Sequence, residues 1–347
     1  MAGSLTVPTV LASLGGGQQN LTLIDANFSA ITGYVNVREL TIGALAARPA
    51  AQYAGRYYFA SDQQGGTLYE DTGIGWQQIA PGLTQVIAGS APQVLVGLTL
   101  SNDVGAPNTT LDVAAGAASS DDATIANRIL MTLGSAITGT TAGTWVVGTG
   151  QPKLDAGAVG ADTWYHVFLI ERVDTSAVDM LFSTSASAPT MPASYTKRRR
   201  IGSFRTDGSS NILAFTQVGD RFTWTATVLE VSATNPGVAA VTVALGRVPT
   251  GVQVVARCLI GAQNNGVADD VFALFSPLAA TDETPGGTNS DIPPVKNATG
   301  RVIIALTPKD IQTTTGAGVR YRLSFSDGDV LAYLRVTGWN DRRGQDA

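Results

Sequence analysis

Short runs of alternating apolar and polar residues, bounded by Gly, Pro, Asp or Ser, recur along most of the chain. Within residues 83–222 these runs include VLVGLTLS, TLDVAAG, RILMTLG, TWVVGTG, TWYHVFLIERV, DMLFSTS and RRIGSF. Within residues 223–347 they include TWTATVLEVS, AAVTVAL, VQVVARCLIG, VFALFSPL, RVIIALT, YRLSFS and VLAYLRVTGW. Because successive side chains of a strand point to opposite faces, this pattern predicts short β-strands. We expect a mainly β protein with two antiparallel β-sandwich-like domains, a central one over 83–222 and a C-terminal one over 223–347.

Residues 46–82 carry aromatic-rich runs that predict a separate small sheet. The runs Tyr57–Phe59, Leu68–Tyr69 and Trp76–Ile79 are separated by DQQGG and TGIG, which contain residues that turns favour. We therefore expect a small β-meander of three strands. Because so small a sheet buries little core of its own, it should be a connector that packs on neighbouring parts.

The first 45 residues contain one segment with helical periodicity. Its apolar residues are three or four positions apart: Ile24, Phe28, Ile31 and Val35. Asp25 can cap the start of a helix here, and Gly33 lies near its end. A helix of about two turns is marginal in water, so its apolar stripe must pack on the same chain or on symmetry-related copies. The pattern predicts a short N-terminal helix within residues 1–45.

The overall composition points to a protein that buries surface between subunits. Charged residues make up 14% of the 347-residue chain and apolar residues 44%, with a mean hydropathy of +0.13. Soluble domains carry about 25% charged residues, so some apolar surface should be covered by other copies. The formal net charge of −5 argues against nucleic acid as a partner.

Cysteine usage and hydropathy exclude several other classes of protein. The single cysteine, Cys258, excludes an intrachain disulfide framework and a cysteine-based metal cluster. No stretch reaches the roughly 18 uninterrupted apolar residues of a membrane span, and the N-terminal residues lack the positive start of a signal peptide. We expect synthesis in the cytoplasm and no membrane insertion.

Residues suited to catalysis are few and lie in ordinary structural contexts. His166, the only histidine, lies within the strand-like run WYHVFLI and is expected to fill the core or an edge of a sheet. Cys258 lies within VARCLIG and is expected to be a small buried hydrophobic residue. Glycosidase chemistry needs two carboxylates in one cleft. The acidic residues that lie close together in sequence all occupy turn-like contexts: Asp121, Asp122, Asp269, Asp270, Asp282 and Glu283. We predict no catalytic residue, no metal ligand and no cofactor.

Two other features of the sequence suggest contacts. The basic run Lys197–Arg200 lies on an expected strand, where alternate side chains point to opposite faces, so structural or intersubunit pairing is expected there instead of nucleic-acid binding. The polar stretch 279–300 has no periodic apolar pattern and predicts a long loop, which either binds a partner or is an exposed connector. The residues taken as candidate receptor contacts in and near this loop are Asn264, Asn265, Asp282, Asn289 and Asp291.

A long segment of the central region resembles one that recurs in tail-fibre and minor structural proteins of tailed bacteriophages. In that pattern a W-Y-H-V-F-L-I strand leads to D-x-L-F-S-T-S, then to a P-x-x-P-x-x-Y turn and an R-R-I-G-S strand. The corresponding residues here are Trp164–Ile170, Asp179–Ser185, Pro189–Tyr195 and Arg199–Ser203. The stretch GRYYFASDQQGGTLYEDTGIGWQQIAPG and the closing TGWNDRRG also resemble elements of such fibre proteins.

The resemblance implies a virion structural subunit that assembles as a homotrimer. Its N-terminal part is expected to attach to other phage virion proteins, with Ile24, Phe28, Ile31 and Val35 as candidate particle-anchor residues. Its C-terminal β domain is expected to face outward and contact a host cell-surface glycan or protein. After synthesis in the host cytoplasm, the protein would be assembled onto the phage particle.

Two alternatives remain open beside a structural fibre or spike. One is a polysaccharide-degrading tailspike that uses a carboxylate pair at a subunit interface, since phage spikes often carry such activity. A secreted carbohydrate-binding module or adhesin also fits the β content, although a signal peptide is missing. With 347 residues we expect a short appendage on a tail, collar or head, without a long shaft.

Overall fold

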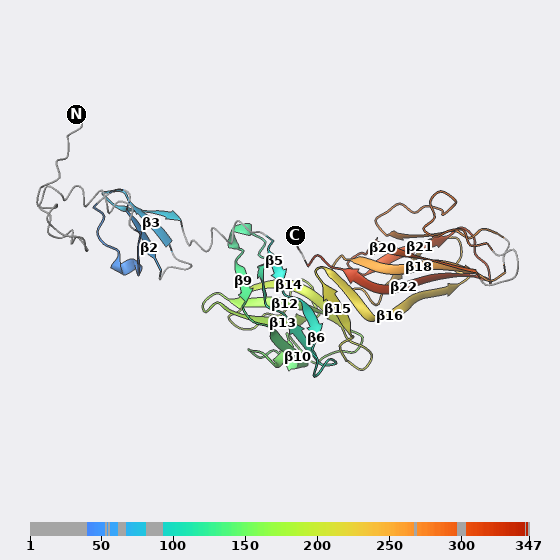
Figure 1. The fold of residues 1–347 in the computed structure, drawn as a ribbon, viewed down its shortest axis with the longest axis horizontal. Coiled ribbons are helices and arrows are strands. Elements are labelled where there is room, and N and C mark those ends of the chain that lie inside the picture. The colour runs from blue at the N-terminus through green and yellow to red at the C-terminus, as the bar shows by residue number, and fades with distance from the viewer. Residues whose placement is uncertain are drawn as a thin grey trace, which may run out of the picture. The chain divides into compact units, whose positions relative to one another are not determined.

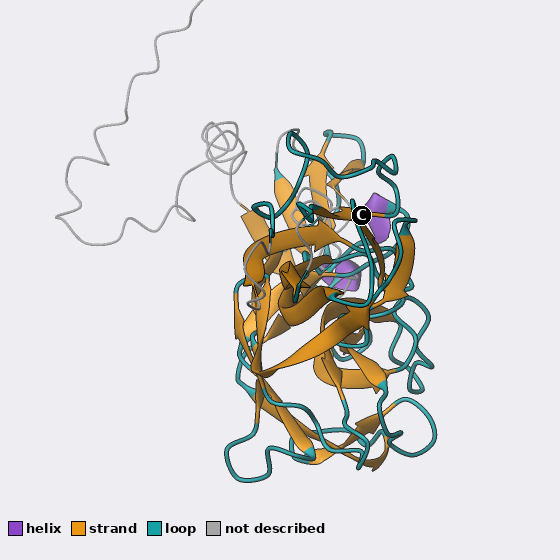
Figure 2. Ribbon diagram, turned by 90° about the vertical axis from the view of Figure 1, so that its right-hand side faces the viewer, coloured by secondary structure: helices purple, strands orange, loops and turns teal. Residues whose placement is uncertain are grey.

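The computed structural model describes residues 40–80 apart from 53, 55 and 62–66, residues 93–296 apart from 267 and 268, and residues 303–345 apart from 344. The chain divides into two compact units, residues 1–90 and 91–347, which are described separately (Figure 1). Strands form nearly all the regular structure, which confirms a mainly β protein (Figure 2). The predicted helix with Ile24, Phe28, Ile31 and Val35 lies outside the described residues.

Helical structure within the described ranges is limited to two single-turn 3-10 helices. These are η4 (Leu45–Ala47) and η5 (Ile125–Asn127). No helix in these ranges has the length and hydropathy needed to cross a bilayer.

The first unit contains one four-stranded sheet. Its strands are β1 (Leu40–Gly43), β2 (Tyr57–Ala60), β3 (Thr67–Asp71) and β4 (Trp76–Ala80), in the order β1-β2-β3-β4. Strands β2, β3 and β4 are antiparallel and match the three strands expected from the aromatic runs. Strand β1, which lies ahead of residue 46 and was not expected, pairs in parallel with β2. A connecting role for this sheet stays a prediction.

Polar contacts to the segment between β1 and β2 stabilise this small sheet. Asp71 is buried and forms an ion pair with Arg56, and it also accepts a hydrogen bond from the Gln52 backbone N–H at 2.9 Å. The hydroxyl of the buried Tyr58 donates to the Ala44 carbonyl at 2.7 Å. These contacts attach residues 44–56 to the sheet, which has few apolar side chains to hold it together.

The central part of the second unit contains a seven-stranded sheet in the order β14-β12-β13-β11-β10-β7-β6. Its strands are β6 (Leu100–Asn102), β7 (Thr110–Val113), β10 (Ile137–Thr144), β11 (Gln151–Leu154), β12 (Trp164–Arg172), β13 (Ala177–Ser183) and β14 (Lys197–Arg205). A smaller sheet in the order β5-β8-β9 comprises β5 (Leu95–Gly97), β8 (Gly116–Ser119) and β9 (Leu130–Leu133).

Strand β12 is covered on both faces, which explains its nearly continuous apolar sequence. Its residues are buried from Trp164 to Glu171, without alternation between buried and exposed positions. Val167 and Leu169 belong to the main buried cluster, whereas Phe168 belongs to a second cluster on the other face. A strand with one solvated face would instead alternate in polarity.

The C-terminal part contains a five-stranded sheet, in the order β15-β16-β22-β18-β20, and a three-stranded sheet, in the order β17-β21-β19 (Figure 1). The strands of the larger sheet are β15 (Phe215–Val218), β16 (Arg221–Thr234), β18 (Val255–Asn264), β20 (Ile303–Gln312) and β22 (Val330–Asn340). Those of the smaller sheet are β17 (Val241–Ala244), β19 (Ala273–Pro277) and β21 (Gly318–Leu323). All pairings in both sheets are antiparallel.

These two sheets share one apolar core, as a β-sandwich does. Burial alternates along β18, so that Ala256, Cys258 and Ile260 point inward. They belong to the same buried cluster as Val319 and Tyr321 of β21 in the smaller sheet. One face of the larger sheet therefore packs toward the smaller sheet and the other face points away from it.

Aromatic packing joins the central and C-terminal parts. Trp339 of β22 stacks on Phe222 with ring centroids 4.8 Å apart, and it lies 5.4 Å from Trp164 of β12 and 4.9 Å from Trp224. The main buried cluster is continuous through both parts. Strand β16 runs across the expected boundary between residues 222 and 223, and the division into two domains at that point stays a prediction.

A buried ion pair ties together strands of the central sheet. Lys153 of β11 donates from Nζ to Asp179 of β13 at 2.7 Å, and both side chains are almost completely buried. Asp179 also accepts backbone hydrogen bonds from Gly148 and Met180 at 2.8 and 2.7 Å. Burial lowers the pKa of Lys153, while Asp179 acts in the opposite direction. Breaking such a pair leaves an uncompensated charge in the interior.

Replacing Asp179 by Asn tests this pair. Asp179→Asn should lower the free energy of unfolding by about 3 kcal/mol, because the Lys153 ammonium would be left buried without its counter-charge. Urea denaturation followed by circular dichroism measures the loss. The matched control is Asp174→Asn, since Asp174 pairs with Arg172 at the surface and its loss should change stability little. Equal effects of both substitutions would contradict the prediction.

Candidate functional site

The basic run on β14 is largely paired with carboxylates of the same chain. Lys197 contacts Asp122 at 2.8 Å, and Arg198 contacts Asp121 at 3.3 Å. Arg200 is also paired, as described below. Structural pairing of the run is thus confirmed for three of its four residues. Asp121 and Asp122 were also considered as a catalytic pair, but each carboxylate forms an ion pair with a basic side chain of β14. Burial raises the pKa of Asp121, and Arg198 acts in the opposite direction.

The acidic and amide residues predicted in the loop 279–300 are held by contacts within the C-terminal part. Asp282 accepts a hydrogen bond from Arg322 at 3.0 Å and lies 3.8 Å from Arg320. Asn289 accepts a hydrogen bond from the Gly286 backbone at 2.7 Å and donates to Glu283 at 3.2 Å. These contacts fix the shape of the loop while leaving residues 279–284 exposed.

Of the other candidate contact residues, two are half-buried and one is fully buried. Asp291 is half-buried, accepts the Phe275 N–H at 2.6 Å and pairs with Lys309. Asn265 is half-buried as well. Asn264 is fully buried, and its amide donates to the Val295 carbonyl at 3.3 Å. Asn264 therefore serves the fold and offers no surface to a receptor, which corrects that part of the prediction.

His166 lies in a network of buried polar side chains. The sequence did not predict this network. The His166 Nδ1 lies 2.9 Å from the Ser203 hydroxyl, because β12 and β14 pair these two residues directly. The Arg200 guanidinium contacts the same hydroxyl at 3.3 Å and forms two hydrogen bonds of 2.7 Å with Asp341. Ser203 lies 37 positions after His166, so only the strand register reveals the pair.

The environment of His166 indicates a structural role for this network. Burial lowers the pKa of His166 to about 4, with a further contribution from Arg200. In a catalytic triad a carboxylate orients the imidazole, whereas here Asp341 pairs with Arg200 and the Thr250 backbone contacts the imidazole. Both His166 and Ser203 are buried. His166 thus fills the core, one of the two places expected for it.

Cys258 also matches its prediction. Its side chain is buried, and burial raises the pKa of the thiol to about 12, so the thiolate is not populated near neutral pH. Within the described ranges, no three His, Cys, Asp or Glu side chains are grouped as a metal site requires.

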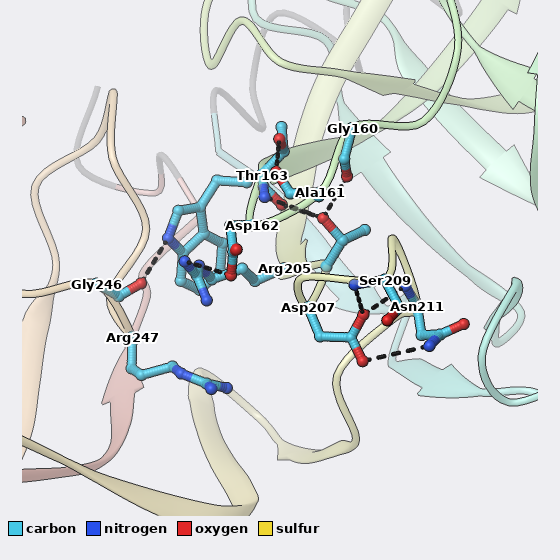
Figure 3. Close-up of polar contacts among 12 residues, drawn as sticks. Gly160, Ala161, Asp162, Thr163, Arg205, Asp207, Ser209, Asn211, Gly246 and Arg247 are labelled. Carbon is cyan, nitrogen blue, oxygen red and sulfur yellow. Dashed lines mark hydrogen bonds and ion pairs between the residues drawn. The ribbon is translucent and has the colours of Figure 1, made fainter.

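The loop between β17 and β18 is clamped at two consecutive residues. The indole of Trp164 donates to the Gly246 carbonyl at 3.1 Å, and that of Trp224 donates to the Arg247 carbonyl at 2.9 Å. The carboxylate of Glu230 accepts both backbone N–H groups, at 3.0 and 2.7 Å. Residues 246 and 247 are therefore rigidly placed against the central sheet, as Figure 3 shows for Gly246.

Charged side chains gather beside this clamp (Figure 3). Arg205 lies 3.3 Å from the exposed carboxylate of Asp162, and the Arg247 guanidinium lies 5.8 Å from the Trp224 ring centroid. Burial lowers the pKa of Arg247, and the positive charge of Arg205 lowers it further. Asp207 is occupied by backbone N–H groups of its own turn, which lower its pKa. This cluster orders the junction between the two parts of the unit.

The outer face of the five-stranded C-terminal sheet exposes apolar side chains. A shallow groove of about 170 Å³ lies on this face. It is lined by Leu229, Leu259, Ile304, Leu306, Tyr333 and Arg335, which come from β16, β18, β20 and β22. We call these six residues the outer face. Leu229 is 42% exposed, and Ile304 and Leu306 are each 51% exposed.

Strand register explains how these side chains come together. Leu229 and Leu259 both lie opposite Arg335, one on each side of β22. Gly261 lies between Tyr333 and Leu306 in neighbouring strands. A Cβ on Gly261 would lie 2.6 Å from Leu306, so the absence of a side chain lets Leu306 lie over this position. Solvated sheet faces are usually polar, so this outer face departs from the common pattern of an antiparallel sheet.

The clamp at residues 246 and 247 gives a test of indole hydrogen bonding. Trp224→Phe should lower the free energy of unfolding by about 1 kcal/mol more than Trp339→Phe, because the first change leaves the Arg247 carbonyl without its donor. The Trp339 indole N–H has no hydrogen-bond partner among the described residues, so it is a matched control in the same core. Denaturant titration of both variants measures the difference. Equal losses would mean that the clamp adds no stability.

The comparison with known proteins does not place the chain in a family. No protein-family model matches the sequence. No curated protein matches it significantly.

Proposed function

We propose that this protein is a structural subunit of a tailed-bacteriophage appendage, a short fibre or spike of the tail, collar or head. The observation that carries the proposal is the outer face of the C-terminal sheet, where Leu229 of β16 and Ile304 and Leu306 of β20 are exposed. A subunit whose role is assembly needs such a surface, and burial against other copies would remove it from water. The resemblance of the central motifs to phage fibre proteins supports the same class.

The expected assembly is a homotrimer. A closed ring of three copies can bury the same surface of each chain around one rotation axis. The low proportion of charged residues, 14%, supports a chain with much surface buried between copies. The side chains of the outer face come from four adjacent strands, which gives neighbouring copies a broad contact surface.

The two ends of the chain are assigned different partners in this proposal. The N-terminal part, with Ile24, Phe28, Ile31 and Val35, would attach to other virion proteins. The C-terminal part would present the loop 279–300 to a host glycan or protein. Asp282 and Asn289 support this choice, because intrachain contacts fix the loop and leave its first residues exposed.

An enzymatic spike has less support. Among the predicted carboxylates, Asp121, Asp122 and Asp282 each contact a basic side chain of the same chain. Burial raises the pKa of Asp121, as a general acid requires, but its carboxylate is held in an ion pair with Arg198. A carbohydrate-binding adhesin would use the same exposed loop. It would differ from a phage appendage in being absent from phage particles.

Disrupting the outer face tests the assembly. Analytical ultracentrifugation of the full chain should give a mass about three times 35.8 kDa. Leu306→Asp should shift it toward the monomer, because the new carboxylate would have to be buried in the contact. Val104→Asp is the control, since Val104 is equally apolar and 97% exposed elsewhere on the same unit. A wild-type monomer at micromolar concentration, or a trimer unaffected by Leu306→Asp, would overturn the assembly.

Particle imaging tests the appendage itself. In phage particles that carry this chain, a density map should place residues 40–80 nearer the particle body than the five-stranded sheet of the C-terminal part. Antibodies against the C-terminal part should bind intact particles and slow their adsorption to host cells. Particles without the chain, or a C-terminal part buried against the capsid or tail, would exclude this proposal.

A further inference from the structure

Four arginines are buried where β14 meets the segment that follows β22. The exposed fractions are 8% for Arg128, 3% for Arg199, 8% for Arg200 and 5% for Arg343. Burial of a guanidinium is unfavourable unless its charge and its N–H groups are compensated. Each of these four residues therefore requires a partner.

Two of the four guanidinium groups, those of Arg128 and Arg200, form hydrogen bonds with acceptors of the same chain. The two terminal nitrogens of Arg200 each donate to Asp341 at 2.7 Å, in a bidentate pair. The Nε of Arg128 donates to the Asp122 carbonyl at 2.8 Å. The Asp341 carboxylate also accepts a third hydrogen bond, from the Arg343 backbone N–H to its Oδ1 at 2.8 Å.

The other two arginines are incompletely compensated. The Nε and Nη2 of Arg199 are buried and have no hydrogen-bond partner among the described residues. The Nη2 of Arg343 donates to Asp220 at 2.9 Å, but its Nε and Nη1 are likewise buried without a partner there. These four guanidinium nitrogens, two of Arg199 and two of Arg343, are therefore buried donors without an acceptor among the described residues.

The electrostatics around Arg199 also indicate a shortage of negative charge. Burial lowers the pKa of Arg199, and the positive charges of Arg128, Arg200 and Arg343 lower it further. Asp121 acts in the opposite direction, but it already pairs with Arg198. Asp341 links two residues of the group, since it pairs with the Arg200 guanidinium and accepts the Arg343 backbone N–H, and Arg199 precedes Arg200 on β14.

We propose that Arg199 and Arg343 bind a small inorganic oxyanion, of the phosphate or sulfate class, inside the folded protein. The planar guanidinium presents paired N–H donors that match the oxygens of such an ion. The ion must be small, because both side chains are at least 95% buried and a polymer or protein surface has no access to them. The ion then supplies both the missing acceptors and the missing negative charge.

Two measurements on the full-length protein test for the ion. Phosphorus analysis after exhaustive dialysis into chloride buffer should detect retained phosphate if it is held tightly. If it exchanges, phosphate or sulfate should raise the Tm above that in chloride of equal ionic strength, with a logarithmic dependence on ion concentration. Testing the two ions separately shows which one the site prefers.

Variants locate the effect. Arg199→Met should abolish the anion-dependent rise in Tm and the retained phosphorus, whereas Arg172→Met should leave both unchanged, because Arg172 pairs with Asp174 at the surface. If Arg199→Met does not fold, Arg199→Lys keeps the charge but loses the paired donors, and should weaken anion binding about tenfold.

Three outcomes would overturn the inference. The first is wild-type protein with no retained phosphorus and the same Tm in chloride, sulfate and phosphate, in which case water satisfies the arginines. The second is an anion effect of equal size in Arg199→Met or Arg199→Lys and in the wild type. The third is a Tm that depends on protein concentration but not on either ion, which would assign the acceptor to a second copy of the chain.

Discussion

The packing of Trp339 is the constraint on which the larger unit depends. Its ring stacks on Phe222 and contacts Trp164 and Trp224, which come from β16 and β12, two other places in the sequence. These contacts bury a large apolar area at the point where the central and C-terminal sheets meet. The adjacent indoles of Trp164 and Trp224 then fix residues 246 and 247 by hydrogen bonds. Residues 91–347 consequently form one compact unit, although their sequence pattern reads as two series of strands.

Much of the strand content was predictable, because alternation of apolar and polar side chains is a local property. The three aromatic-rich runs of the first unit gave β2, β3 and β4, and the run WYHVFLIER gave β12. Strand β1 was missed, since its short sequence LTIG has too few residues to establish a period. The expected helix lies outside the described residues and stays a prediction.

The polar contacts were not predictable to the same degree. Arg200 and Asp341 are 141 positions apart, and His166 and Ser203 are 37 apart, so no local pattern connects them. That Lys197 and Arg198 would be paired could be inferred, but their partners could not. Asn264 was misassigned because a polar residue near a loop looks exposed in sequence, whereas strand β18 carries it into the interior. Burial depends on register and packing, which composition does not reveal.

Strand β16 has a mechanical consequence. It begins beside β15 at the aromatic junction and pairs with β22 over Arg221–Thr223 and again from Val228 to Thr234, with shifts of register along the pairing. Antiparallel hydrogen bonds lie perpendicular to the strands, so a pull along β16 loads many of them in shear at the same time. Peeling the strand from one end would instead break them one after another. Tension along this strand would thus be shared over its length, so the sheet should resist forces along its strands better than forces across them.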